Sequence, residues 1–224
     1  LARQERSTGA GHGDFEFVVD NITLEDDLAR RDLTINAIAI AEDGSKQIID
    51  PFNGRSDIKN HILRHVTDEG FVEDPLRVLR VARFLSQFPA FSVARETTKL
   101  IKKMVADGML AHLTAERVGN EMIKALNARH PSRFFVYLNM VGALEVLMPE
   151  LHALTKVPAG PYDHHPEGDA FVHTMMVLDQ ATEVGQLEVR FGALVHDLGK
   201  GNSFVDKLPS HHGHEQRGVP LTRA

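Results

Sequence analysis

The chain has 224 residues, 42% hydrophobic and 25% charged, which is enough apolar mass for one sizeable core or two small ones. It contains no cysteine, which excludes a disulfide scaffold, a thiolate zinc site and a cysteine nucleophile, and suits a reducing compartment such as the cytoplasm. No apolar run approaches the roughly 18 residues of a membrane-spanning helix, so we expect no membrane partner.

The net charge of −6 argues against general attraction to nucleic acids, because phosphates are bound by Lys and Arg. Residues 55–103 nevertheless hold ten Lys or Arg against six Asp or Glu, a net charge of +4 in an otherwise acidic chain. An acidic protein with one basic segment can bind a polyanion there. The chain begins with Leu1 and ends soon after a histidine-rich stretch, so we expect a fragment at both ends.

Strands and turns are predicted up to about residue 66. Thr23 and Asp26 have the spacing of a helix capping box. The apolar run 33–40, interrupted by Asn36, predicts a buried strand. The other predicted elements of this part are a glycine-rich loop at 9–14, a strand at 15–19, a turn at 50–54 and a last strand at 62–66.

Helices are predicted from Pro75 onward, because apolar residues recur there at spacings of three with arginines between them. A cluster of prolines between 149 and 166 predicts a linker before a C-terminal unit. The further predicted helices span 96–106, 115–128, 133–141, 171–184 and 189–198.

The first group of candidate site residues is Arg30-Arg31-Asp32, followed by Asn36. Arginine binds phosphate oxygens through its planar fork, and Asp and Asn can bind sugar hydroxyls. The same residues are also compatible with ordinary ion pairs at a helix end, with Asn36 bonded to a neighbouring loop.

The second group begins with Asp74-Pro75. Asp before Pro is typical of a helix start, with Asp74 as N-cap, and this structural role stays open. Asp74 and Arg77, three residues apart, also offer an acceptor beside a donor fork. Such a pair would accept the amino group and ring nitrogen of cytosine or adenine and reject guanine and uracil. Arg80 and Arg83 continue the row as a triphosphate clamp would, or are solvated arginines beside a core helix.

The third group lies in the C-terminal region, where seven of the 13 histidines fall between His164 and His214. His196-Asp197 ends an apolar helix, and His173 lies on the preceding one. Imidazole and carboxylate ligands suit a divalent transition metal that activates water for attack on a phosphate ester. A histidine on an apolar face can equally be a satisfied core residue, and His211, His212 and His214 either join the set or lie nearby.

A capped helix start at Thr114 carries Arg117 and Glu121 at a spacing of four, which predicts an ion pair that supports the arginine helix. With Asp50-Pro51, Gly54 and Asp57 added, these motifs resemble, in order and spacing, motifs B to E of class II tRNA nucleotidyltransferases, the CCA-adding enzymes. The tail, with His173 and the run 196–200, resembles the HD domain of the bacterial long form.

The resemblance implies an α+β fold: a partial nucleotidyltransferase palm at 1–68, a helical nucleotide-reading and RNA-binding neck at 69–155, and a partial helical HD domain at 156–224. It implies addition of C, C and A to tRNA 3′ ends from CTP and ATP with Mg²⁺, and a phosphohydrolase that uses a divalent transition metal such as Ni²⁺ or Mn²⁺.

Residue by residue, the resemblance places Arg31 at the nucleotide phosphates and Asp32 with Asn36 at the sugar. Asp74 and Arg77 would read C and A, Arg80 and Arg83 would complete the nucleotide site, and the metal ligands of the HD domain would be His173, His196 and Asp197.

The family's Asp-x-Asp pair, which binds Mg²⁺, has no counterpart here and is expected upstream, so no catalytic residue for nucleotidyl transfer is assigned and this chain alone is expected not to polymerise. A bacterial poly(A) polymerase shares the motifs. A metal-dependent HD phosphohydrolase with a vestigial palm and a non-catalytic RNA-binding module are the alternatives from other classes.

Overall fold

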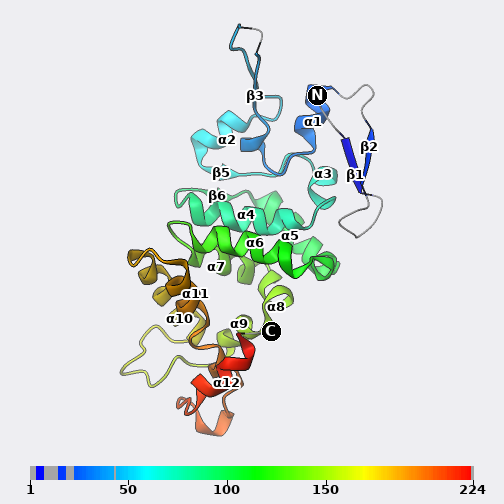
Figure 1. The fold of residues 1–224 in the computed structure, drawn as a ribbon. Coiled ribbons are helices and arrows are strands. Elements are labelled where there is room, and N and C mark those ends of the chain that lie inside the picture. Colours follow the sequence, from blue (N-terminus) through cyan, green and yellow to red (C-terminus); the bar gives the residue numbers. More distant parts are fainter. Residues whose placement is uncertain (1–3, 8–14, 19–22, 43, 223–224) are drawn as a thin grey trace. The chain divides into compact units, whose positions relative to one another are not determined.

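The computed structural model describes residues 4–7, 15–18, 23–42 and 44–222 of the chain. The chain divides into two compact units: unit 1 comprises Leu1–Val81 and Ala90–Thr114, and unit 2 comprises Ala82–Pro89 and Ala115–Ala224. The described elements are mainly helices, with three two-stranded sheets (Figure 1), so the α+β prediction is confirmed. None of the helices in these ranges is both long and apolar enough to span a bilayer.

Unit 1 begins with the antiparallel pair β1 (Gln4–Ser7) and β2 (Phe15–Val18), which confirms the strand predicted at 15–19 over its described residues. The loop predicted at 9–14 lies outside the described residues. Helix α1 (Leu24–Ala29) starts at the predicted capping box, because the Thr23 hydroxyl accepts from the Asp26 amide at 3.1 Å and the Asp26 carboxylate accepts from the Thr23 amide at 3.0 Å.

The prediction of a continuous strand over 33–40 is wrong. The chain forms a short 3₁₀ helix, η1 (Thr34–Asn36), before the strand β3 (Ala39–Ile40), which pairs antiparallel with β4 (Ile48–Ile49). Polar side chains cause the turn: the Asp32 carboxylate accepts from the amide of Leu33 and the side chain of Asn36, each at 2.9 Å. These local bonds offer the backbone an alternative to a sheet ladder.

The predicted turn at 50–54 is confirmed, but a helix, α2 (Gly54–Asn60), follows it that the sequence did not predict. Asp50 caps this helix, because its carboxylate accepts from the amides of Gly54 at 2.7 Å and Arg55 at 2.9 Å. Strand β5 (Ile62–Leu63) is shorter than the predicted strand and pairs parallel with β6 (Ser92–Val93).

The helices predicted from Pro75 onward are confirmed in unit 1. The first of them, α4 (Leu76–Gln87), continues beyond Val81, where this segment of unit 1 ends. Helix α3 precedes these predicted helices and was not predicted. The elements are α3 (Asp68–Val72), α4 (Leu76–Gln87), α5 (Arg95–Ala106) and the 3₁₀ helix η2 (Met109–His112).

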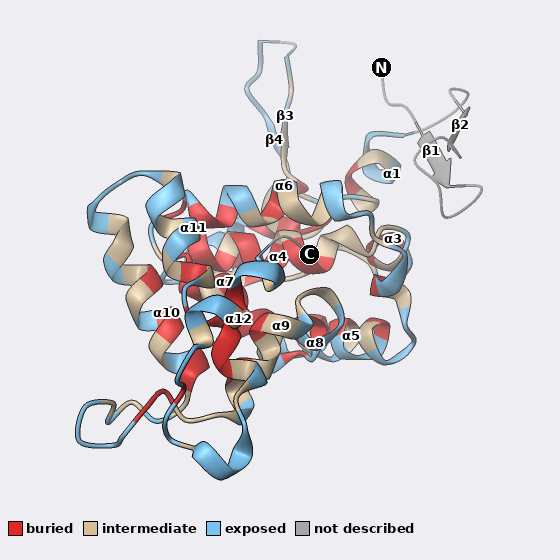
Figure 2. Ribbon diagram, turned by 60° about the horizontal axis from the view of Figure 1, so that its bottom comes forward, coloured by how far each residue is buried: buried red, intermediate tan, exposed pale blue. Residues whose placement is uncertain are grey.

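The first part of unit 2 is helical throughout, and α7 contributes a large share of its core, with five of its nine residues buried (Figure 2). The linker predicted over 149–166 is partly wrong, because Pro149 starts a helix, where its missing N–H is not needed. The elements are α6 (Ala115–Leu126), α7 (Ser132–Met140), α8 (Ala143–Leu147), α9 (Pro149–Ala153) and η3 (Leu154–Lys156).

The second part of unit 2 follows the irregular segment 157–169. The two predicted helices are confirmed, although the first ends as a 3₁₀ turn and the second ends at Val195, just before His196-Asp197. The elements are α10 (Ala170–Gln180), η4 (Ala181–Glu183), α11 (Leu187–Val195), η5 (Leu198–Asn202), η6 (Val205–Lys207) and α12 (His214–Leu221).

Helix α12 packs closely on η5, and Gly199 permits this approach. A Cβ atom at residue 199 would lie 1.9 Å from the carbonyl oxygen of His214, whereas a Cβ atom at Gly192, within α11, would meet no atom within 4 Å. These two glycines of unit 2 thus have opposite surroundings.

We predict that Gly199→Ala destabilises the protein by about 1–3 kcal/mol, because backbone must move to admit the methyl group. The matched substitution Gly192→Ala should stabilise it by about 0.5–1 kcal/mol, because alanine loses less conformational freedom in a helix. Urea unfolding monitored by circular dichroism measures both. Equal stability of the two variants would contradict the close packing of η5 on α12.

Candidate functional site

Asp32 is the centre of a polar cluster in unit 1. It is 5% exposed, and its carboxylate accepts from Asn36 at 2.9 Å and from the Arg80 guanidinium at 2.7 Å. Arg80 comes from α4, so the ion pair ties that helix to the turn before η1. The structure therefore brings together three of the predicted site residues: Asp32, Asn36 and Arg80.

Arg31, the residue before Asp32, is exposed. Its guanidinium donates to the carbonyl oxygen of Asn36 at 2.8 Å and pairs with Asp27 at 3.2 Å. An exposed ion pair of this kind contributes at most about 1 kcal/mol. The Arg31 guanidinium thus lies at the surface beside the Asp32 cluster and is only weakly held there.

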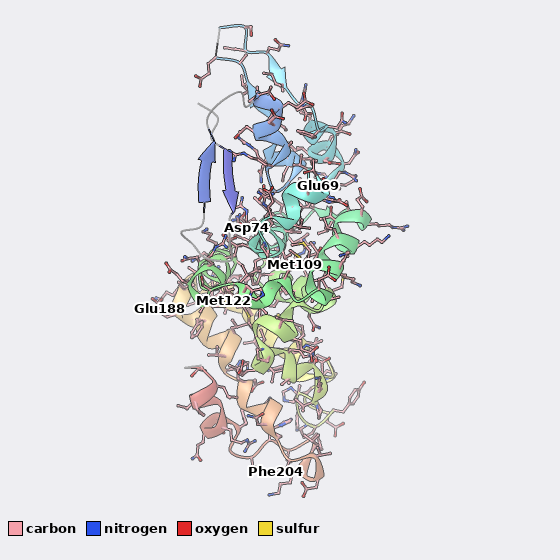
Figure 3. The ribbon with its side chains drawn as sticks, turned by 90° about the vertical axis from the view of Figure 1, so that its right-hand side faces the viewer. Glu69, Asp74, Met109, Met122, Glu188 and Phe204 are labelled. Atoms are coloured by element: carbon pink, nitrogen blue, oxygen red, sulfur yellow. The ribbon has the colours of Figure 1, made fainter. Side chains whose placement is uncertain are left out.

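Asp74 and Arg77 both have structural partners (Asp74 is labelled in Figure 3). The Asp74 carboxylate accepts from the amide of Leu76 at 3.1 Å at the start of α4, as its predicted role as a cap requires. The Arg77 guanidinium donates to three backbone carbonyls, those of Arg30, Arg31 and Gly70. Burial lowers the pKa of Arg77 somewhat, and nearby carboxylates, Asp32 first among them, oppose this.

Arg83 belongs to unit 2 and is 8% exposed. Its guanidinium donates to Glu121 at 2.6 Å and to Gln87 at 2.9 Å, and lies 4.3 Å from the ring centre of Phe84. Lys124 also donates to Glu121, at 2.9 Å. Burial would raise the pKa of Glu121, but the bonds from Lys124 and Arg83 hold it below its ordinary value. The sequence predicted neither Arg83 nor Lys124 as a partner of Glu121, which it paired with Arg117.

The motif that starts at Asp50 contributes packing. A Cβ atom at Gly54 would lie 2.1 Å from the carbonyl oxygen of Thr34, so only glycine allows α2 to approach η1. Asp57, on α2, accepts from the Thr34 hydroxyl at 2.8 Å and from Arg64 at 3.0 Å. The motif thus supports the turn that presents Asp32 and Asn36.

The three predicted metal ligands, His173, His196 and Asp197, come together in unit 2. One ligand atom from each lies within 4.8 Å of the others. Asp197 Oδ2 is 3.2 Å from His196 Nε2 and 3.9 Å from His173 Nε2. Two imidazole nitrogens and a carboxylate form a donor set that suits a divalent transition metal.

Asp197 is 2% exposed and has two further partners that the predicted ligand set omitted. The Lys200 ammonium lies 2.8 Å from Oδ2, and His214 Nε2 lies 3.3 Å from Oδ1. Burial would raise the pKa of Asp197, but bonds from His196 and Lys200 hold it well below its ordinary value. The bond to Asp197 in turn raises the pKa of His196.

The histidines that the sequence left open have different positions. His214 joins the Asp197 cluster, whereas His211 bonds to the Ser203 hydroxyl and the Pro158 carbonyl, each at 2.7 Å, and burial lowers its pKa. His212 is exposed. The spacing of the three histidines alone could not separate these roles.

Glu167 was missed entirely, and nothing in its sequence context indicated a role. Its Oε1 atom lies 2.9 Å from His165 Nδ1 and 2.7 Å from His173 Nδ1. The bond from His165, a bond from the backbone of Glu167 and, more weakly, the bond from His173 lower the pKa of Glu167 to about 2. His165 also lines a cavity of about 540 Å³ in unit 2. Its other lining residues are Thr155, Lys156, Val157, Pro158, Gly160, Tyr162, Gly168, Asp169 and Pro209.

Comparison with known families finds two matches along the chain. The family described as "Poly A polymerase head domain" matches residues 2–64, and the one described as "Probable RNA and SrmB- binding site of polymerase A" matches residues 90–155. Together these matches define the class: a segment similar to a polymerase head domain, followed by one similar to the RNA-binding-site family of polymerase A.

Among individual proteins, the "Multifunctional CCA protein" of Teredinibacter turnerae is 52% identical over 225 residues, which cover 99% of this chain and 54% of that protein. The solved structure of a CCA-adding enzyme in its apo form II superposes with a TM-score of 0.69 at 23% identity, over 99% of this chain and 50% of the other. A tRNA nucleotidyltransferase solved with a primer tRNA and an incoming ATP analogue superposes with a TM-score of 0.60 at 26% identity, over 91% of this chain and 55% of the other.

The resemblance to bacterial CCA-adding enzymes that the motifs predicted is therefore confirmed along nearly the whole chain. It spans about half the length of the relatives it matches.

The buried pair of Arg83 and Glu121 yields a prediction for stability. Arg83→Ala should cost roughly 3 kcal/mol, because it removes the buried guanidinium that pairs with the buried Glu121 carboxylate. The double variant Arg83→Met with Glu121→Leu removes both charges and should recover most of that loss. Chemical unfolding measures both variants, and an unchanged stability of Arg83→Ala would contradict a structural role for this pair.

Proposed function

We propose that the protein to which this chain belongs adds C, C and A to tRNA 3′ ends, from CTP and ATP, without a nucleic-acid template. The observation that carries the proposal is the 52% identity, along nearly the whole chain, with a protein named "Multifunctional CCA protein". In this proposal residues 1–68 form part of the palm, 69–155 the neck and 156–224 part of the HD domain. The absence of cysteine suits a cytoplasmic enzyme.

The polar cluster of unit 1 supports the proposed nucleotide site. Arg31 is exposed and weakly paired, so its guanidinium can turn to bind phosphate oxygens. Asp32 and Asn36 are held in place by each other and by Arg80, so they can bind sugar hydroxyls without first becoming ordered. Mg²⁺ would be held by residues other than these.

Base selection is assigned to Asp74 and Arg77. Arg77 also holds three backbone carbonyls, so its removal would disturb the turn that carries Arg31 and Asp32. Arg83 is paired with Glu121 inside unit 2. We therefore assign it an indirect role in the nucleotide site, in which it stabilises α4. Asp74 is therefore the residue whose substitution tests base selection most directly.

We predict that Asp74→Ala weakens discrimination against GTP and UTP about tenfold or more, because one base-reading pair contributes about 1–3 kcal/mol. The assay uses the Teredinibacter turnerae protein with its matched segment replaced by this chain, and measures addition of each of the four NTPs to a tRNA transcript that lacks CCA. Binding of tRNA should change much less. Glu69→Ala is the matched control, because Glu69 is an exposed carboxylate on α3 (Figure 3).

Unchanged selection in Asp74→Ala would reject its role as a reader of bases. A long A tail made by the unsubstituted chimera would move the assignment to poly(A) polymerase, the class after which the matched head family is named. Addition of C, C and A in the presence of all four NTPs would support CCA synthesis.

We also propose that His173, His196 and Asp197 hold a divalent transition metal such as Ni²⁺ or Mn²⁺, and that unit 2 hydrolyses phosphate esters. The donor set fits such an ion. A bound ion there would lower the pKa of a coordinated water for attack on phosphorus. Lys200 and His214 add positive or hydrogen-bonding groups beside Asp197 that can contact a phosphate.

We predict that the 224-residue chain hydrolyses bis(p-nitrophenyl) phosphate in the presence of Mn²⁺ or Ni²⁺ and loses this activity with EDTA. His196→Ala should reduce the rate at least 100-fold, because it removes one of the three ligands. His212→Ala, an exposed histidine in the same unit, is the control and should retain the rate. A metal-dependent rate that survives His196→Ala would reject this ligand set.

A further inference from the structure

His173 faces two clusters with its two ring nitrogens. Its Nδ1 atom lies 2.7 Å from Glu167 Oε1, and its Nε2 atom lies on the side of Asp197, 3.9 Å from Oδ2. A neutral imidazole carries a proton on one nitrogen and a lone pair on the other. The partner that accepts a hydrogen bond from one ring nitrogen therefore leaves the other nitrogen free to bind a metal.

The distances around His173 distinguish its hydrogen bond to Glu167 from its place in the proposed metal site. Two ligand atoms about 2.1 Å from a tetrahedral metal stand about 3.4 Å apart. The separations of 3.2 and 3.9 Å around Asp197 Oδ2 are close to this value. The separations of 2.7 and 2.9 Å from Glu167 Oε1 to His173 and His165 are shorter and match hydrogen bonds.

Glu167 is held in place by two neighbouring histidines. Its side chain is 12% exposed, and a single carboxylate oxygen accepts from His173 and His165. The two imidazole rings meet edge to face at 5.0 Å. Gly160 leaves room for His165, because a Cβ atom at residue 160 would lie 2.4 Å from its ring.

We propose that Glu167 is a positioning residue for the metal site: its carboxylate accepts a hydrogen bond from the Nδ1–H group of His173, so that the lone pair of His173 lies on Nε2 and points toward His196 and Asp197. His165 holds Glu167 in place from the cavity side. A carboxylate behind a metal-binding histidine fixes the tautomer and ring orientation and makes the imidazole a stronger ligand. The inference rests on the metal site proposed above.

The test uses the 224-residue chain and Zn²⁺, a diamagnetic probe. Long-range ¹H–¹⁵N NMR should show His173 protonated at Nδ1 before Zn²⁺ is added and coordinated through Nε2 afterwards. Calorimetry should show that Glu167→Gln weakens Zn²⁺ binding about 10–100-fold. The same NMR experiment should show that His173 of this variant is a mixture of tautomers. Glu188→Gln, an exposed residue on α11 (Figure 3), should change neither measurement.

Each contrary result has a distinct meaning. Equal Zn²⁺ affinity in the wild-type chain and Glu167→Gln would overturn the positioning role alone. Coordination of Zn²⁺ by Nδ1 of His165 and His173 would also overturn it, because Glu167 would then be a ligand, as these three residues can also form a metal-binding group. No Zn²⁺ binding by the wild-type chain would overturn the metal site and this inference together.

Discussion

Each unit is organised around carboxylates that are buried and must therefore be paired. Four such carboxylates in the described part of the chain have residues only 2–5% exposed, and each carboxylate lies within ion-pair distance of a Lys or Arg side chain. Breaking one such pair costs about 3–5 kcal/mol, because the remaining charge stays buried. The pairs are Asp32 with Arg80, Asp57 with Arg64, Glu121 with Arg83 and Asp197 with Lys200.

This constraint changes the meaning of the arginine row on α4. Arg77 holds backbone carbonyls, Arg80 pairs with Asp32, and Arg83 pairs with Glu121. Residues at successive spacings of three thus serve three different partners, two in unit 1 and one in unit 2. The row shapes the proposed nucleotide site mainly by fixing the acidic and polar groups that would touch the ligand.

The need to pair a buried carboxylate also organises the histidine cluster of unit 2. Asp197 is buried, and its four partners come from α10, the residue that caps α11, η5 and the start of α12. Glu167 and His165 add a second layer from the irregular segment 157–169. The proposed ligand set, held in this way, would need little rearrangement to bind an ion.

Local patterns determined much of this protein from the sequence alone. The capping box at Thr23, the start of α4 and most later helices depend on neighbours within four residues, so periodicity and cap residues predict them. The ordered motifs also identified the family and placed Asp32, Asn36, His173 and Asp197 among the candidate site residues. The apolar run at 33–40 misled, because periodicity does not register the polar bonds of Asp32 and Thr34.

Only the tertiary structure decided which charged groups meet. Glu121 finds Arg83, 38 residues away, and Arg80 finds Asp32, 48 residues away, because folding brings distant buried charges together. Glu167 has no motif around it, and its role follows solely from where the loop at 157–169 places it against His173. Sequence spacing reports contacts along one helix or strand, whereas the pairing of a buried charge is decided by every element packed around it.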